Sequence, residues 1–238
     1  MIKVITSKDN PRVKYAYSLR DNKTREEHRQ FIGESRKSLD LAISQNLVKE
    51  VFTYEALDLD ESITQYLVNE NVMKKLSSSK NPEGVVFIAN YLTFEKDNFS
   101  KILYLDEIND PGNLGTMIRT ALAFNFDAVV ISPNSVSQYN EKVLAACKGS
   151  NYLIPILNKK LAQVKDDHKA IVTTLSDDSI DVDTLEVPDK FILVMGNEAH
   201  GVNKDIIRSA DIKVKIPISN IDSLNVSVAA GILMHKLS

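Results

Sequence analysis

Short apolar runs and amphipathic stretches alternate through the second half of the chain. Runs that predict buried strands fall at residues 102–106, 128–132, 170–175, 191–195 and 214–218, with 152–157 a weaker strand because of Pro155. The intervening stretches predict helices at 115–124, 141–148, 203–210 and 224–237. Buried strands that alternate with helices favour an α/β fold, in which helices cover both faces of a parallel sheet.

The first ninety or so residues predict a smaller α/β unit of their own. Helices are expected at 11–19 and 34–45, strands at 48–54 and 85–89, and a brief extended piece at 31–33. Residues 77–84 have turn chemistry, and 177–186 are expected to form an acidic surface loop with one helical turn. We therefore expect two domains, residues 1–93 and 101–238, joined by a polar linker over 94–100.

The few cysteine and histidine residues argue against a disulfide-bonded protein and against a metal site. A single cysteine, Cys147, excludes an internal disulfide framework and fits a reducing compartment. One cysteine and four scattered histidines give no metal-ligand cluster, so no metal is expected. The first residues lack the apolar core of a signal peptide, and no apolar run approaches membrane-span length. We expect a cytoplasmic protein that does not contact a membrane.

Charge is distributed unevenly, although the formal net charge is only −3. Residues 1–37 hold ten basic side chains against five acidic ones, and residues 38–72 reverse this balance. A basic arm on an acidic body can follow a phosphate backbone. A solvated helical face of mixed sign explains the same pattern, so the distribution alone leaves both interpretations open.

A glycine-rich turn follows the expected strand 102–106. It leads into a helix that Asn113 is expected to cap, and Gly112 and Gly115 permit close approach of a ligand. Arg119 is spaced so that its side chain points back over this turn, which suggests a phosphate clamp. The competing interpretation is a solvated helix arginine.

Polar residues also follow the strands expected at 191–195 and 214–218. The first strand meets Gly196-Asn197-Glu198, and the second leads to Ser223-Leu224-Asn225, where Ser223 is a good N-cap for a helix that is apolar almost all round. Such strand ends predict a ligand site at the carboxyl edge of the sheet. The alternatives are local: Glu198 could cap a helix near Val202, and Asn225 could bond only its own turn.

Three stretches together resemble the motifs of the SpoU/TrmH family, which belongs to the SPOUT superfamily. They are residues 113–121 (NLGTMIRTA), 195–202 (MGNEAHGV) and 216–230 (IPI…SLNVSVAA). Residues 5–14 and 31–36 resemble the L30e-like substrate-binding domain of its rRNA enzymes, so the resemblance covers nearly the whole chain. Ser35, Glu83 and Ala199 are mild departures from the family pattern, and the first two bear on the RNA target rather than on the chemistry.

The resemblance implies an S-adenosylmethionine-dependent RNA ribose 2′-O-methyltransferase. It further implies a deep C-terminal trefoil knot and a homodimer, which agrees with the apolar final helix. The cofactor would be held near Thr174, Leu175, Gly196, Asn197, Ile216, Ile218 and Leu224.

For the reaction, the resemblance implies catalytic roles for Arg119, Asn113, Glu198, Ser223 and Asn225. Because a guanidinium stays protonated, we interpret Arg119 first as a clamp on the target phosphate and ribose, and a base role remains a hypothesis. Glu198 would order the loops, and the other three would bond the ribose and loop backbone. RNA contacts are expected from the basic arm, at Arg12, Lys14, Lys23, Arg25, Arg36 and Lys37.

The expected substrate is structured RNA, with 23S rRNA preferred for a two-domain member. The alternatives are a tRNA 2′-O-methyltransferase, a non-catalytic RNA-binding protein on the same scaffold, and a Rossmann-type nucleotide enzyme. The last ranks lowest, because Gly112 and Gly115 do not form a dinucleotide fingerprint.

Overall fold

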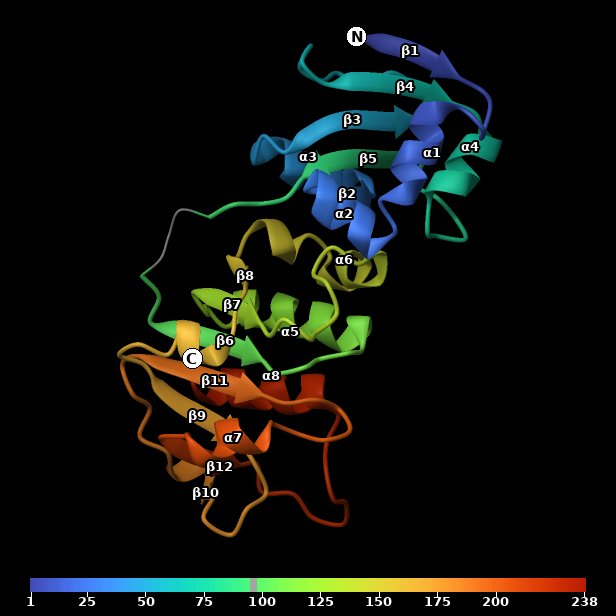
Figure 1. Ribbon diagram of the computed structural model, residues 1–238. Helices are drawn as coiled ribbons and strands as arrows, with labels where there is room; N and C mark the ends of the chain where they lie inside the picture. Colours follow the sequence, from blue (N-terminus) through green and yellow to red (C-terminus); the bar gives the residue numbers. More distant parts are fainter. Residues whose placement is uncertain (95–97) are drawn as a thin grey trace. The chain divides into compact units, whose positions relative to one another are not determined.

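The computed structural model describes residues 1–94 and 98–238, which divide into two compact units (Figure 1). The first unit comprises Met1–Thr93 together with Tyr139–Leu144. The second comprises Phe94–Gln138 and Ala145–Ser238. The expected linker, residues 94–100, falls partly on 95–97, which lie outside the described residues.

The first unit is built on a mixed sheet. Its strands lie in the order β1 (Ile2–Ile5), β4 (Thr64–Val68), β3 (Val48–Thr53), β5 (Val85–Asn90) and β2 (Gln30–Glu34). β1, β4 and β3 are parallel, and β5 runs antiparallel to both β3 and β2. The helices are α1 (Pro11–Ser18), α2 (Asn22–His28), α3 (Arg36–Ser44) and α4 (Glu70–Leu76). The elements predicted in this region are confirmed, whereas β1, α2, β4 and α4 were not predicted.

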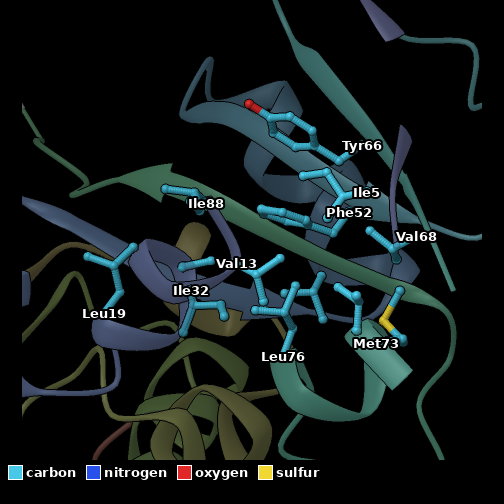
Figure 2. Close-up of a cluster of buried hydrophobic side chains, with 13 residues drawn as sticks. Ile5, Val13, Leu19, Ile32, Phe52, Tyr66, Val68, Met73, Leu76 and Ile88 are labelled. Atoms are coloured by element: carbon cyan, nitrogen blue, oxygen red, sulfur yellow. The ribbon is translucent and has the colours of Figure 1, made fainter. Parts of the chain in front are cut away.

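Helices α1 and α4 pack on this sheet around a shared apolar core (Figure 2). Both helices place apolar side chains at helical spacing, such as Val13 and Ala16 in α1 and Val72 and Leu76 in α4, and all four are buried. The aromatic rings of Phe52 and Tyr66 stack beneath them, with centroids 5.0 Å apart. Burial of these side chains is the main favourable term that holds the unit together.

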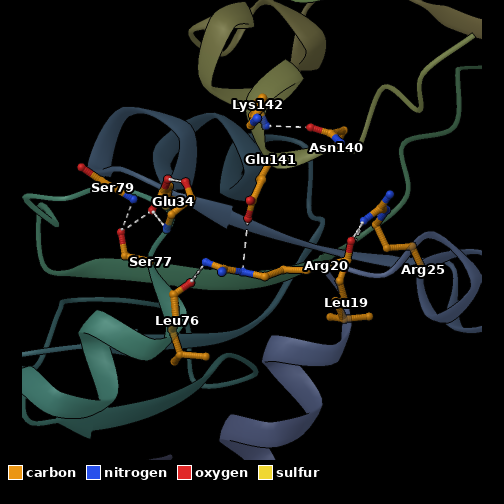
Figure 3. Close-up of polar contacts among 11 residues, drawn as sticks. Leu19, Arg20, Arg25, Glu34, Leu76, Ser77, Ser79, Asn140, Glu141 and Lys142 are labelled. Carbon is orange, nitrogen blue, oxygen red and sulfur yellow. Dashed lines mark hydrogen bonds and ion pairs between the residues drawn. The ribbon is translucent and has the colours of Figure 1, made fainter. Parts of the chain in front are cut away.

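Residues 139–144 complete the first unit although they lie far from it in sequence. The ring of Tyr139 stacks on Tyr91 with centroids 3.8 Å apart and on Phe31 with centroids 4.8 Å apart. Its hydroxyl accepts a hydrogen bond from the backbone N–H of Leu92 at 2.9 Å. Figure 3 shows Glu141 paired with Arg20, whose guanidinium also donates to the Leu76 carbonyl. α6 (Glu141–Cys147) begins within this segment.

Arg25 is the one buried residue of α2 and is only 3% exposed. Its guanidinium donates to the carbonyls of Leu19 at 3.1 Å and Arg20 at 2.6 Å (Figure 3). It also donates to Asn22 Oδ1 at 3.1 Å. These bonds satisfy carbonyl groups at the end of α1. The expectation that Arg25 contacts RNA does not fit this burial, because the cation is committed to backbone inside the unit.

The second unit contains a parallel sheet, as the alternating pattern predicted. Its strands lie in the order β10 (Ile180–Asp181), β12 (Ile212–Lys215), β9 (Lys169–Thr173), β11 (Phe191–Met195), β6 (Lys101–Leu105), β7 (Ala128–Ile131) and β8 (Ile156–Asn158). All the pairings between them are parallel. The central strand β11 is buried along its whole length, which explains its uninterrupted apolar sequence.

Helical elements cover both faces of this sheet. On one face Ile102, Tyr104 and Val194 pack with the helical turn η2 (Leu161–Gln163) and with α7 (Lys204–Arg208). On the other face α5 (Pro111–Ala123) and α8 (Val226–Lys236) pack against each other, α5 beside β7 and α8 beside β11. The sheet is therefore an inner layer between two layers of helix.

Several details of the second unit differ from the sequence prediction. The strand expected at 214–218 is β12, which ends at Lys215, because Pro217 lacks the N–H that a strand interior needs. Of the weak strand at 152–157, only Ile156 and Leu157 are extended, at the start of β8, and the helical turn η1 (Ser150–Tyr152) precedes them. The expected loop at 177–186 contains its helical turn, η3 (Val182–Thr184), but it also contributes the edge strand β10. α5 begins at Pro111, four residues early, because Asp110 caps it. Within the described part of the chain, no helix has the length and apolar character needed to cross a membrane.

Candidate functional site

A cavity of about 620 Å³ opens at the carboxyl edge of the parallel sheet in the second unit. This volume lies in the range of small-molecule pockets, roughly 300–1,000 Å³. Its walls are the ends of β9, β11 and β12 and the start of α8. All the cofactor-binding candidates line it: Thr174, Leu175, Gly196, Asn197, Ile216, Ile218 and Leu224. The structure thus brings together in one wall residues that lie up to 50 positions apart in sequence.

The loop after β11 is closed on itself by backbone hydrogen bonds. Asn197 N–H donates to the Gly201 carbonyl at 3.0 Å, and Gly201 N–H donates to the Asn197 carbonyl at 2.9 Å. A Cβ on Gly196 would lie 2.1 Å from Val202 N and 2.2 Å from Gly201 C, so no larger residue fits without moving backbone. The glycine is required here by close approach of the chain to itself.

Asn197 fastens this loop to the turn after β6. Its side-chain Nδ2 donates to the Glu107 carbonyl at 2.7 Å, and its Oδ1 accepts from the N–H groups of Ala199 at 2.8 Å and His200 at 3.2 Å. The sequence interpretation offered this amide as a ligand partner. The structure instead commits both ends of the amide to the protein, the oxygen within the loop and the nitrogen to Glu107. His200 is an exposed loop residue at the cavity rim.

Glu198 reaches from the same loop to the N-terminus of α5. Its carboxylate accepts hydrogen bonds from Asp110 N–H at 3.2 Å, Asn113 Nδ2 at 3.1 Å and Asn109 N–H at 3.4 Å. Partial burial raises the pKa of Glu198, but hydrogen bonds from its own N–H and from these donors outweigh burial and hold the pKa below 4.5. The alternative that Glu198 caps the helix near Val202 is wrong, because Asn203 caps α7.

Asn113 and Asn225 connect the two helix starts. Asn225 Nδ2 donates to Asn113 Oδ1 at 3.2 Å, while Asn113 Nδ2 donates to Glu198. Asn225 is the N-cap of α8, and its Oδ1 accepts from the N–H groups of Ser227 and Val228. The sequence predicted Asn113 and Ser223 as the helix caps, and both predictions are wrong. Asp110 caps α5 by accepting from Asn113 N–H at 2.7 Å, and Ser223 is an exposed residue on the cavity wall.

Arg119 stands outside this hydrogen-bonded group. It is exposed on α5, does not line the cavity, and has no hydrogen bond or ion pair to any residue of 1–94 or 98–238. An arginine without a protein partner at the surface retains all five of its donors for a ligand. The structure therefore groups Asn113, Glu198, Ser223 and Asn225 and leaves the guanidinium of Arg119 free.

A buried carboxylate at the end of β6 was missed by the sequence interpretation. Asp106 is 5% exposed, and its Oδ2 accepts from Asn203 N–H at 2.9 Å. Burial raises the pKa of Asp106, with the Asn203 hydrogen bond acting in the opposite direction. The contact ties the start of α7 to β6. The available signal was an acidic residue directly after an apolar strand.

The candidate RNA ligands of the first unit fall into two groups. Arg12 is paired with Glu50, Arg36 with Asp40 at 3.2 Å, and Lys14 lies 3.7 Å from Asp9. Lys23 and Lys37 are exposed, and no ion pair joins either to another described residue. The described residues also contain no cluster of three or more acidic, histidine or cysteine side chains that could hold a metal ion.

Comparison with known proteins identifies the family. Residues 100–235 match the model of the SpoU rRNA Methylase family, and residues 10–86 match the MRM3-like substrate binding domain. The chain is 30% identical over 246 residues to the 23S rRNA (guanosine(2553)-2'-O)-methyltransferase RlmP of Bacillus subtilis, covering 99% of each chain. A methyltransferase named as uncharacterized from Synechocystis is 26% identical and also matches over nearly the whole chain.

Solved structures agree with the sequence comparison. An S-adenosylmethionine-bound rRNA methyltransferase from Sinorhizobium meliloti is 27% identical, with a TM-score of 0.89 over 99% of this chain and 97% of that one. An RNA 2'-O ribose methyltransferase matches with a TM-score of 0.81 at 26% identity. These matches leave no place for the Rossmann-type alternative. The protein belongs to the SpoU rRNA methylase family of S-adenosylmethionine-dependent RNA methyltransferases, as its three motifs predicted.

Proposed function

We propose that this protein methylates the 2′-hydroxyl of one ribose in 23S rRNA. The observation that carries the proposal is a cavity at the sheet edge whose wall is hydrogen-bonded, through Glu198 and Asn225, to the start of α5. The full-length match to a relative named as a 23S rRNA 2'-O-methyltransferase supports this target over tRNA. The nucleotide equivalent to the one in that relative's name is the first candidate.

The cavity fits S-adenosylmethionine in size and in lining. It combines apolar walls from Leu175, Ile216 and Leu224 with a polar rim at Gly196 and Asn197, a lining typical of small-molecule sites. Thr174 and Ile218 complete the proposed set of cofactor-binding residues. Bound there, the cofactor supplies an electrophilic methyl group. The remaining task for the protein is to place a ribose hydroxyl in line with that group, and such positioning can supply several kcal/mol of the barrier.

Arg119 is proposed to hold the RNA. Its free guanidinium matches a phosphate in a bidentate arrangement and remains protonated, so we assign it the clamping role and not that of a base. Glu198, Asn113 and Asn225 form a hydrogen-bonded chain that orders the turn leading into the helix of Arg119. Ser223, exposed on the cavity wall, is free to bond the target ribose.

We further propose a homodimer joined through α8, and the surface of that helix supports it. Its sequence is apolar on every side, yet Val228 is 51% exposed, and Ala229, Gly231 and Ile232 are only half-buried. An apolar helix left partly uncovered is typical of a subunit interface. We also propose that the chain after β11 forms a trefoil knot. The bonds from residues 197–198 and 225 to residues 107–113 support this, because they bind the returning chain to an earlier turn.

The first unit is proposed to be an L30e-like RNA-binding domain, with residues 94–100 as the linker to the methyltransferase domain. The match to a substrate-binding domain model over residues 10–86 supports this assignment. Arg25 is removed from the proposed phosphate ligands because it is buried. The ligands that remain are Arg12, Lys14, Lys23, Arg36 and Lys37. Lys23 and Lys37 are the strongest candidates, because neither is ion-paired with a residue of 1–94 or 98–238 that RNA would have to displace.

The proposal is tested by mapping ribose methylation in 23S rRNA and tRNA from cells with and without this protein. Loss of one 23S rRNA methyl group on deletion is the expected result, and loss of a tRNA methyl group instead would favour the alternative target. In vitro, Arg119→Ala should abolish transfer and leave the Kd for S-adenosylmethionine nearly unchanged. Arg208→Ala is a suitable control, because Arg208 is an exposed arginine of the same unit that pairs with Asp205 and does not line the cavity.

A non-catalytic protein on the same scaffold makes a different prediction. It would bind RNA without any methyl group appearing in the presence of S-adenosylmethionine, and deletion would change no ribose modification. Equal loss of cofactor binding and transfer in Arg119→Ala would contradict the clamp assignment while leaving the reaction itself intact.

A further inference from the structure

Two serine pairs of matching geometry lie after two strands of the second unit, β7 and β9, which β6 and β11 separate in the sheet. Ser132 and Ser135 follow β7, and their hydroxyl oxygens lie 3.0 Å apart. Ser176 and Ser179 follow β9, and their hydroxyl oxygens are also 3.0 Å apart. In each pair the N–H of the second serine donates to the carbonyl of the first at 3.0 Å, which closes a turn. None of the roles described above uses these residues.

The Ser132/Ser135 pair holds the turn between β6 and α5. Ser132 is 4% exposed and accepts from Glu107 N–H at 2.8 Å, while Ser135 accepts from Ile108 N–H at 3.0 Å. Glu107 has a left-handed backbone, with φ +55°, a conformation that a residue with a side chain needs contacts to maintain. Asn197 bonds the carbonyl of the same Glu107 from the other side. The turn that leads to Asn113 and Arg119 is therefore held by hydrogen bonds from the serine pair and from Asn197.

The Ser176/Ser179 pair holds the cavity wall after β9. Ser179 is 7% exposed, and its hydroxyl donates to the Thr174 carbonyl at 3.0 Å. Thr174 and Leu175 line the cavity, and Thr174 N–H donates to the Val214 carbonyl at 3.0 Å. This pair thus fixes a segment of wall, whereas neither Ser132 nor Ser135, nor the turn that they hold, lines the cavity.

We propose that the two pairs are positioning residues that act on separate parts of the site. The Ser132/Ser135 pair sets the α5 start that presents the RNA clamp, and the Ser176/Ser179 pair sets the wall that holds the methyl donor. The inference rests on the proposed function. It predicts that the two pairs, alike in chemistry and each with one buried member, affect different kinetic constants.

The test compares two double variants, Ser132→Ala with Ser135→Ala and Ser176→Ala with Ser179→Ala. S-adenosylmethionine binding is measured by calorimetry without RNA, and kcat and KM are measured on 23S rRNA. The first double variant should lose about tenfold or more in kcat with the cofactor Kd within about twofold, since small displacements of positioning groups cost that much. The second should raise the cofactor Kd about tenfold with kcat at saturation nearly retained.

Conservative variants separate positioning from a purely structural role. Ser135 and Ser176 are the half-buried members of their pairs, so Ser135→Thr and Ser176→Thr can be made with the hydroxyl kept. Ser135→Thr should retain the kcat that the first double variant loses, and Ser176→Thr should retain the cofactor Kd that the second double variant raises. Parallel loss of kcat and cofactor affinity in both double variants, or no loss in either, would overturn the proposal. Absence of methylation by the unaltered protein would instead refute the proposed function, so the two failures are distinguishable.

Discussion

Asn225 donates its side-chain amide to the side-chain carbonyl of Asn113 at 3.2 Å, although 112 positions separate them. The same Asn113 donates to Glu198, so three side chains from three motifs form one hydrogen-bonded chain. The two outer members also bind backbone at a helix start: Glu198 accepts from Asp110 N–H at α5, and Asn225 accepts from Ser227 N–H at α8. Asn113 itself lies in the first turn of α5. The contact explains why the motifs occur together, because each supplies a bond that the others need.

The first prediction concerns the two asparagines. Asn225→Asp keeps a carboxylate oxygen to cap α8 but removes the donor to Asn113, so stability should change by less than about 1 kcal/mol while kcat falls. Asn113→Asp places a second carboxylate beside Glu198, whose oxygen lies 3.1 Å from the present amide, and should lower kcat roughly 100-fold. Thermal melts and single-turnover methylation measure both. Additive effects in the double variant would contradict direct coupling.

The second prediction concerns the two glycines of the loop after β11. Gly196→Ala puts a Cβ against Val202 N and Gly201 C and should destabilise the protein by about 1–3 kcal/mol and abolish cofactor binding. Gly201→Ala is the control: its φ is +69°, but a Cβ there meets nothing within 4 Å, so only a backbone strain of about 1–2 kcal/mol is expected. Calorimetric titration with S-adenosylmethionine should separate them. Equal loss of affinity would show that the close approach at Gly196 is not what shapes the wall.

The third prediction is a pH dependence carried by Glu198. Because hydrogen bonds hold its folded pKa below the ordinary 4.5, the carboxylate contributes stability that is fully present above that pH. This contribution is lost as the pH falls through the folded pKa. Glu198→Gln should therefore lower Tm at neutral pH, and its difference from the unaltered protein should shrink as the solution is acidified below 4.5. A difference that stays constant with pH would show that the charge does not matter.

The fourth prediction tests the aromatic stack of the first unit. Tyr139→Ala removes a ring that is 5% exposed and packed on Tyr91 and Phe31, at an expected cost of about 3–5 kcal/mol. Tyr139→Phe keeps the ring and should cost about 1 kcal/mol, while hydrogen exchange at the Leu92 amide quickens. Tyr54→Ala, at a 46% exposed tyrosine of the same unit, should cost far less than Tyr139→Ala. Similar melts for all three would contradict the packing role.

The parallel sheet could be predicted from sequence because its central strands, β11, β6 and β7, are buried on both faces. Phe191 to Met195 is apolar throughout, and such runs stand out between amphipathic helices. α2 was invisible for the opposite reason. Its sequence, NKTREEH, has no apolar periodicity, and its only buried side chain is the guanidinium of Arg25.

The residues of the site were predicted from sequence, but their hydrogen-bond partners were not. The motif residues were assigned to a common ligand site, and the structure places most of them on one cavity wall. Local cap rules chose Ser223 and Asn113, whereas Asn225 and Asp110 cap the helices. Those rules cannot register that Asn225 also bonds Asn113 across the fold. The serine pairs carry no signal in sequence, because Ser-x-x-Ser is common in turns.

The segment Tyr139–Leu144 gives the first unit a consequence for synthesis on the ribosome. The unit closes its aromatic stack with Tyr139, which is translated 46 residues after Thr93. Until then the faces of Phe31 and Tyr91 that Tyr139 covers lack that partner, and Arg20 lacks Glu141. The nascent amino-terminal unit therefore lacks the Tyr139 ring of its aromatic stack while β6, α5 and β7 are being translated. A fragment ended at Thr93 would stay in that unfinished state, so transplanting the unit onto another enzyme requires carrying the distant hexapeptide with it.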